Sequence, residues 1–170
     1  LMALSVATDT ALISVMFYLF TYLFMNLGAF FILIYANNTM NAETIKDLNG
    51  FGSKSPLLAG CMILFLLSLT GLPPTSGFIA KFYLSAAMIE AQKFYWLAVV
   101  AVINTVISLF YYFNIAKSMY LDDIENEEIL EKNTVFTSIV LLCAIPTALL
   151  IINWSSLYNY IESSVLKGLG

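Results

Sequence analysis

The chain has 170 residues, 61% of them hydrophobic and only 11% charged. Soluble domains carry about a quarter charged residues, so this chain has too few charges for a surface that faces water on all sides. Its basic residues are seven lysines that form no patch, and this excludes a nucleic-acid-binding protein. The sequence contains no histidine, so the common zinc and haem sites would lack their ligands, and we expect no metal site.

The hydrophobic residues form long runs, which is typical of a membrane protein. Residues 1–7 are apolar, and we expect them to be the end of a truncated span, with the chain as the C-terminal portion of a longer protein. Residues 12–36 follow without a charge. As a helix this stretch would cover about 37 Å, enough to cross a hydrocarbon core of roughly 30 Å.

Residues 37–56 form a polar connection. Asn41 is expected to cap a short helix there, and Gly50 to end it. Ile45, Leu48 and Phe51 recur at a spacing of three, which favours a helix lying on the membrane surface with one apolar side.

Two short apolar stretches, 57–72 and 75–92, are separated by Pro73 and Pro74. Proline lacks an N–H group and disfavours helical geometry in the preceding residue, so a helix must stop here. The two pieces are either one broken transmembrane helix or a tight re-entrant pair. Lysine counts give the same four-to-two bias for both topologies, so the positive-inside rule does not choose between them. We place the helix break at five residues: Pro73, Pro74, Thr75, Ser76 and Gly77.

The rest of the chain predicts two further spans and a tail. Residues 94–120 are apolar with aromatic residues at both ends, as suits membrane interfaces. An acidic loop follows, then a span at 133–154 that contains Pro146, at which we expect a kink. Residues 155–170 have apolar residues four apart and predict a surface amphipathic helix. The fold class is therefore an all-α, polytopic membrane helix bundle in a single membrane domain. Cys61 and Cys143 are expected in its core.

Lys81 is the most informative residue because it lies within the apolar sequence GFIAKFYLSAA, next to the helix break. A lysine at the middle of a membrane costs about 2.5–3.5 kcal/mol on insertion scales. Burial disfavours the ammonium form, so such a lysine can load and release a proton. Discontinuous helices also place exposed backbone groups where ions move. We therefore predict that Lys81 transfers protons; the alternative is a lysine whose ammonium group reaches the membrane surface.

Polar residues on the next span could continue a proton path from Lys81. They fall on one side of a helix, although each could equally serve to pack helices together. The predicted path consists of Asn104, Ser108, Tyr111 and Tyr112. Ser68 and Thr70 are expected to satisfy the carbonyl groups that the prolines leave free.

The sequence LSLTGLPPTSGFIAKFYL closely resembles the broken-helix motif of the antiporter-like subunits of respiratory complex I. YLFMNLGAFFIL and IKDLNGFGSKSP resemble the preceding helix and loop of the same proteins. The resemblance covers residues 1–121, and the last span fits in position and length only. Lysine followed by Phe-Tyr is similar to the N-type branch, the counterpart of mitochondrial subunit 2.

The resemblance implies a proton-translocating subunit of NADH:quinone oxidoreductase, a fourteen-helix fold of which this is the last third, and Lys81 as the channel lysine. It implies no cofactor in this chain: NADH, flavin, iron–sulfur clusters and quinone would be bound by partner subunits. Its partners would be the lipid bilayer and other membrane subunits, in a bacterial inner membrane. Two alternatives remain open, a subunit of a multi-subunit cation/proton antiporter and a structural membrane scaffold.

Overall fold

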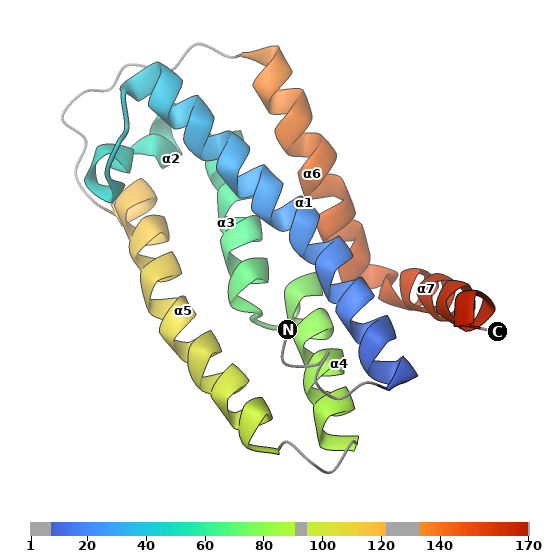
Figure 1. The fold of residues 1–170 in the computed structure, drawn as a ribbon. Coiled ribbons are helices and arrows are strands. Elements are labelled where there is room, and N and C mark those ends of the chain that lie inside the picture. Colours follow the sequence, from blue (N-terminus) through green and yellow to red (C-terminus); the bar gives the residue numbers. More distant parts are fainter. Residues whose placement is uncertain (1–7, 91–94, 122–132, 170) are drawn as a thin grey trace.

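The computed structural model describes residues 8–90, 95–121 and 133–169, and these residues form helices and no strand. Three helices, α1, α5 and α6, are long and apolar enough to cross a membrane. This confirms the predicted all-α membrane bundle, which Figure 1 shows. The elements are α1 (Asp9–Met40), the 3-10 helix η2 (Ile45–Leu48), α2 (Phe51–Lys54), α3 (Pro56–Thr70), α4 (Ser76–Glu90), α5 (Tyr95–Leu121), α6 (Thr134–Ile152) and α7 (Trp154–Leu169).

Helix α1 is longer than the apolar run that predicts it. The hydroxyl oxygen of Thr8 caps its start by accepting a hydrogen bond from the Ala11 N–H. At its end Asn41 adopts the left-handed conformation, with φ of 52°, and its N–H donates to the Asn37 carbonyl. The expectation that Asn41 starts a short helix is therefore wrong: asparagine tolerates this conformation and ends α1 instead.

The connection after α1 packs against the bundle through buried apolar side chains. Thr44, not Asn41, starts the 3-10 helix η2. Leu48 and Phe51 are buried, and the Phe51 ring lies edge-on to Tyr35 of α1 with 6.4 Å between centroids. Ser118 of α5 donates a hydrogen bond of 2.6 Å to the Ile45 carbonyl. The predicted surface helix is wrong because two of its three apolar residues find partners within the protein.

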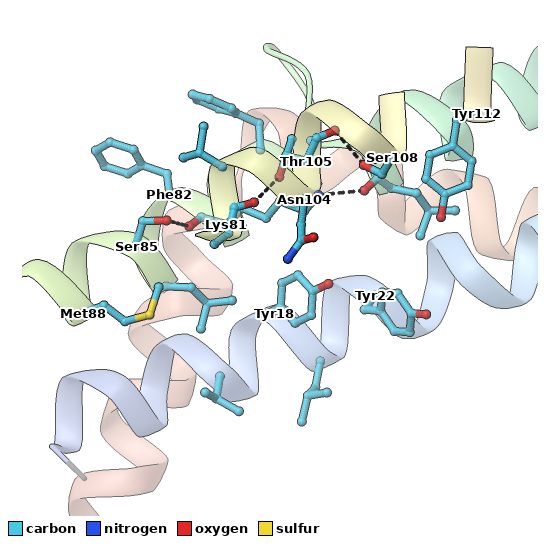
Figure 2. Close-up of a pocket in the computed structure, with 18 of the residues that line it drawn as sticks. Tyr18, Tyr22, Lys81, Phe82, Ser85, Met88, Asn104, Thr105, Ser108 and Tyr112 are labelled. Carbon is cyan, nitrogen blue, oxygen red and sulfur yellow. Dashed lines mark hydrogen bonds between the residues drawn. The ribbon is translucent and has the colours of Figure 1, made fainter. Parts of the chain in front are cut away.

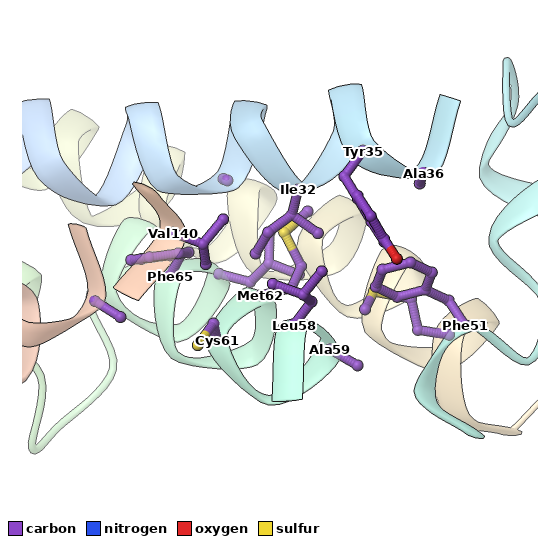
Figure 3. Packing of buried hydrophobic residues seen from close by; sticks show 14 of the residues in the cluster. Ile32, Tyr35, Ala36, Phe51, Leu58, Ala59, Cys61, Met62, Phe65 and Val140 are labelled. Atoms are coloured by element: carbon purple, nitrogen blue, oxygen red, sulfur yellow. The ribbon is translucent and has the colours of Figure 1, made fainter. Parts of the chain in front are cut away.

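The core lies where α1, α3 and α6 meet (Figure 3). Phe65 of α3 packs directly against Gly28 of α1, where a side-chain carbon would collide with its ring. Cys61 and Cys143 are both buried in this cluster, as expected, and both are free thiols. The glycine lets the broken helix approach α1 closely, and this contact holds α3 in place.

Helices α3 and α4 follow one another in the same direction across the bundle (Figure 1). The broken helix of the prediction is confirmed, and the re-entrant alternative is wrong. The observed interruption covers residues 71–75, so it starts two residues earlier than expected, and Ser76 and Gly77 already belong to α4. Pro73 and Pro74 lie inside it, and the peptide bond between them is cis.

Pro146 lies inside α6, and α7 follows α6 directly and turns away from the bundle axis (Figure 1). Val165 of α7 is buried and Tyr160 is 71% exposed, which agrees with an amphipathic helix. Tyr158 attaches α7 to the bundle by stacking on Tyr83 of α4 with 4.6 Å between ring centroids. The truncated span at 1–7 and the acidic loop fall outside the described residues.

Candidate functional site

Backbone N–H groups donate hydrogen bonds to only two of the last four carbonyl groups of α3. Gly71 takes the left-handed conformation, with φ of 80°, and its N–H donates to the carbonyls of Leu67 and Ser68 at 3.0 Å. The Leu72 N–H also donates to Leu67, at 3.2 Å. This is the usual way in which a glycine terminates a helix. It leaves the carbonyls of Leu69 and Thr70 for another donor.

Lys81 supplies that donor. Its Nζ donates hydrogen bonds to the carbonyl oxygens of Leu69, at 2.9 Å, and Thr70, at 2.8 Å. The lysine lies in the second turn of α4 and reaches back across the break to the end of α3. A cation is favoured at a helix C-terminus because the carbonyl dipoles point their negative ends toward it. Each hydrogen bond to a charged group contributes about 1.5–3 kcal/mol.

The start of α4 is held by one side chain from the break and one from α3. The Thr75 hydroxyl accepts from the Phe78 N–H at 3.3 Å and donates to the Leu72 carbonyl at 2.7 Å. The Ser68 hydroxyl accepts from the Gly77 N–H at 3.1 Å. The prolines therefore interrupt the helix, while these hydroxyl groups fix how the second half begins.

The predicted roles of Ser68 and Thr70 are wrong. Thr70 donates its hydroxyl to the Leu66 carbonyl within its own helix, at 2.7 Å. Ser68 serves an N–H group at the start of α4, not a carbonyl of the break. Lysine fills the expected role because its chain is long enough to reach from the second turn of α4 to carbonyl groups that a serine on α3 cannot face.

A cavity of about 810 Å³ opens beside Lys81 and is bounded by α1, α3, α4 and α5 (Figure 2). Apolar side chains form most of its wall. Its polar lining consists of Tyr18 and Tyr22 from α1, Lys81 and Ser85 from α4, and Asn104, Thr105, Ser108, Tyr111 and Tyr112 from α5.

All four residues of the predicted polar path line this cavity together with Lys81: Asn104, Ser108, Tyr111 and Tyr112. The Asn104 amide points toward Tyr18 in Figure 2. Ser108 donates its hydroxyl to the Thr105 carbonyl at 2.8 Å, so its oxygen can accept a further hydrogen bond. The Tyr111 and Tyr112 rings lie 4.5 Å apart between centroids. The geometry brings these residues into reach of one cavity, and their part in proton movement stays a prediction.

The five residues of the predicted break are divided between the interruption and the start of α4. Pro73, Pro74 and Thr75 lie in the interruption, and Ser76 and Gly77 form the first two positions of α4. Ser76 has no exposed surface, and its hydroxyl lies 3.1 Å from that of Ser68. The break is therefore a packed structure and not an open loop.

Lys81 is the only charged residue among the described residues that line the cavity. No group of three or more histidine, cysteine or acidic side chains that could hold a metal occurs in the described part of the chain. The site thus offers one ammonium group, two backbone carbonyls and several hydroxyl and amide groups in apolar surroundings. Such a set can hold a proton on a nitrogen and exchange it with neighbouring polar groups, and it has no nucleophile paired with a base.

Sequence reasoning missed the two tyrosines of α1. Tyr18 and Tyr22 lie four residues apart, and their rings stack at 5.8 Å between centroids. Their spacing places them on one side of the helix, which was a usable signal. It also missed the carbonyl acceptors of Leu69 and Thr70, since backbone groups leave no mark in a side-chain pattern.

Two bacterial proteins are similar to this chain over most of its length. NADH-quinone oxidoreductase subunit N 2 of Sorangium cellulosum is 42% identical over 97% of this chain, which covers 33% of that relative. Subunit N 2 of Chloroherpeton thalassium is 43% identical over 74% of this chain, covering 25% of the relative. The chain thus spans about a quarter to a third of the length of these relatives.

A solved structure of the Mrp complex from Dietzia sp. superposes with a TM-score of 0.84, over 96% of this chain and 39% of the other. The sequences are 17% identical, so this likeness concerns the fold alone. Residues 1–108 match the family described as NADH:quinone oxidoreductase/Mrp antiporter, transmembrane. The chain belongs to the NADH:quinone oxidoreductase/Mrp antiporter transmembrane family.

Proposed function

We propose that the chain is part of a proton-translocating membrane subunit of NADH:quinone oxidoreductase, in which Lys81 carries the proton. The observation that carries this proposal is the position of Lys81, bonded to carbonyls at a helix break and facing a cavity with further polar groups. The relatives with about 40% identity are named as subunit N of that enzyme, which supports the assignment.

In this function the chain performs no redox chemistry of its own. Electron transfer from NADH to quinone would occur in partner subunits, which would bind NADH, flavin, iron–sulfur clusters and quinone. The subunit would be an integral protein of a bacterial inner membrane among other membrane subunits. The bacterial source of the relatives supports this location.

Lys81 would alternate between two situations in this mechanism. While it holds a proton, the ammonium group is stabilised by the Leu69 and Thr70 carbonyls at the C-terminus of α3. A neutral amine loses the attraction to the helix dipole and turns more easily to the cavity. The hydroxyl and amide groups of α1 and α5 then accept or supply the proton.

The test uses a full-length subunit assembled in its complex in membrane vesicles, with Lys81 changed to Ala and to Arg. Lys81→Ala should lower the number of protons pumped per electron, and Lys81→Arg should not restore it, since a guanidinium scarcely releases its proton. Lys46→Ala, which removes an exposed lysine of η2, is the control. Normal pumping and normal quinone reduction in Lys81→Ala would falsify the carrier role.

The second candidate function is a subunit of a multi-subunit cation/proton antiporter. Its support is the superposition on the Mrp complex, which has the same fold but lower sequence identity. The two functions differ in their driving force. Proton movement that requires a sodium or potassium gradient and is independent of quinone reduction would favour the antiporter.

A further inference from the structure

Two buried serines connect the halves of the broken helix. The Ser68 hydroxyl lies 3.1 Å from the Ser76 hydroxyl and accepts a hydrogen bond of 3.1 Å from the Gly77 N–H. Neither serine has any exposed surface. We call Ser68, Ser76 and Gly77 the serine clasp. It joins the last turn of α3 to the first turn of α4 directly, beside the proline-containing connection.

The clasp fits tightly. A side-chain carbon at Gly77 would collide with the Ser68 carbonyl oxygen, so the two backbones touch at this point. An N–H group buried this deeply must have an acceptor, and for Gly77 the acceptor is the Ser68 hydroxyl. Loss of that hydroxyl leaves the N–H unsatisfied, and this favours a shift of the start of α4 away from α3.

The position of Lys81 depends on the start of α4. Lys81 is five residues after Ser76, less than one and a half helical turns along the same rigid element. Its Nζ makes hydrogen bonds of 2.8 and 2.9 Å to carbonyls that belong to α3. Hydrogen bonds of this kind weaken steeply with distance and angle, so a displacement of about 1 Å of α4 against α3 would break at least one of them.

We propose that Ser68 is a positioning residue for Lys81: through the serine clasp it holds α4 so that the ammonium group stays bonded to the end of α3. This inference rests on the proposed function of Lys81 as the proton carrier. The clasp itself carries no proton in this scheme. It sets how strongly the charged form of Lys81 is held, and thereby the pH range in which the lysine can be loaded.

The groups that face Lys81 are few. From α1 the titratable side chains on the cavity are Tyr18 and Tyr22, and from α5 they are Tyr111 and Tyr112. The remaining lining comes from Leu69 of α3 and Gly71 of the interruption, which carry no titratable side chain. Helix α6 also packs against α4, and its titratable side chain is the buried Cys143. With no described carboxylate on the cavity, the two carbonyls are the main stabilisers of the ammonium form.

The experiment compares Ser68→Ala with Ser14→Ala in the full-length subunit, assembled in its complex. Ser14 is the matched control, a serine without exposed surface whose hydroxyl donates to the Thr10 carbonyl within α1. The pH profile of protons pumped per electron is measured for both. Ser68→Ala should move the alkaline limb of this profile to lower pH by about one unit, because the ammonium form loses a charge-assisted hydrogen bond. Ser14→Ala should leave the profile in place.

Ser76→Ala provides the second variant. It removes one hydroxyl of the clasp but keeps the hydrogen bond from the Gly77 N–H to Ser68, so its shift should have the same sign and be smaller. If Ser68→Ala does not assemble, Ser76→Ala carries the test alone. Profiles that coincide with wild type in the assembled variants overturn the positioning role.

A cryo-electron microscopy structure of the assembled variant separates this proposal from the proposed function. In Ser68→Ala, or in Ser76→Ala if only that variant assembles, the Lys81 Nζ should lie beyond hydrogen-bond distance from at least one of its two carbonyls. Unchanged distances contradict the positioning role whatever Lys81 does. Normal pumping in Lys81→Ala, by contrast, contradicts the carrier function. It does not bear on the positioning role, which the distances in the serine variants test separately.

Discussion

The Nζ atom of Lys81 lies 2.8 Å from the carbonyl oxygen of Thr70, eleven residues earlier and on the other side of the helix break. One side chain thereby completes the hydrogen bonding of α3 and presents a titratable group to the cavity. A purely apolar residue at this position would leave two carbonyls without their donor. The lysine thus has a structural task that is satisfied best when it is charged, and this ties the shape of the break to the charge of its side chain.

Gly71→Ala should disturb the break, whereas Gly60→Ala should not. Gly71 has φ of 80°, where an alanine costs about 1–2 kcal/mol, and its new carbon would lie 2.9 Å from Cδ of Lys81. Gly60 is an exposed residue within α3 and has nothing within 4 Å of the added carbon, so alanine there should stabilise α3 by about 1 kcal/mol.

Hydrogen–deuterium exchange in the assembled complex measures both effects. The amides of residues 71 and 72, which close the end of α3, should exchange faster in Gly71→Ala and no faster in Gly60→Ala. Equal protection in the two variants would show that the left-handed conformation at Gly71 does not hold the break.

Single cysteines should report one crossing for the broken helix. Glu43 follows α1 and Leu121 ends α5; both are exposed, and α5 contacts η2 on the same end of the bundle. Cysteines at these two positions should therefore react with an impermeant reagent from the same side of the membrane, which we expect to be the cytoplasm. The background needs Cys61 and Cys143 replaced, although both are buried. Labelling of the two positions from opposite sides is incompatible with the single crossing.

The sequence was sufficient for the main helices and for the break. A charge-free run as long as 12–36 has few structures open to it in a membrane, and two consecutive prolines stop any helix. It was insufficient for the connection after α1. Ile45, Leu48 and Phe51 have the same spacing whether their helix lies on a membrane or against the bundle. What decides is Tyr35, a partner that the local pattern does not reveal.

The sequence likewise revealed some residues of the candidate site and not others. Lys81 stood out because a lysine is costly in apolar surroundings, and the polar residues of α5 shared one side of a predicted helix. Tyr18 and Tyr22 did not stand out, because tyrosine is ordinary in an apolar span. Their contribution depends on how α1 is rotated against α4, and only tertiary packing fixes that rotation.

Asp47 should stabilise the connection after α1 in a pH-dependent manner. Its carboxylate accepts hydrogen bonds from the N–H and the hydroxyl of Thr44 and from the Glu43 N–H. The backbone N–H of Thr44, followed by its hydroxyl, holds the pKa of Asp47 below its usual value. A lowered native pKa means that the stabilisation is fully present above the unfolded value of about 3.9 and is lost as the pH falls through the native value.

Asp47→Asn should therefore speed hydrogen exchange in residues 44–49 near neutral pH, after correction for the intrinsic rates. The difference from wild type should vanish in acid, once the native carboxylate is protonated. Glu43→Gln is the control, since Glu43 joins this arrangement through its backbone N–H and not its carboxylate. A difference that persists at the same size below the native pKa would mean that the charge of Asp47 is not what stabilises the turn.

Tyr158→Ala should loosen α7 from the bundle. Tyr158 stacks on Tyr83 at 4.6 Å and lies edge-on to Phe17 at 6.1 Å between ring centroids, and Trp154 completes this aromatic group with 5.3 Å to Tyr83. Aromatic pairs contribute about 0.5–1.5 kcal/mol each beyond the area that they bury, so the loss of two pairs should raise exchange throughout α7 several-fold.

Tyr160→Ala is the control, because Tyr160 lies two residues away on the same helix and is 71% exposed. Because Tyr83 is on α4, the loosening of α7 should also be visible as faster exchange in the amides around Tyr83. If α7 exchanges equally in the two variants, it is held by its aliphatic residues, such as Val165, and not by the aromatic group.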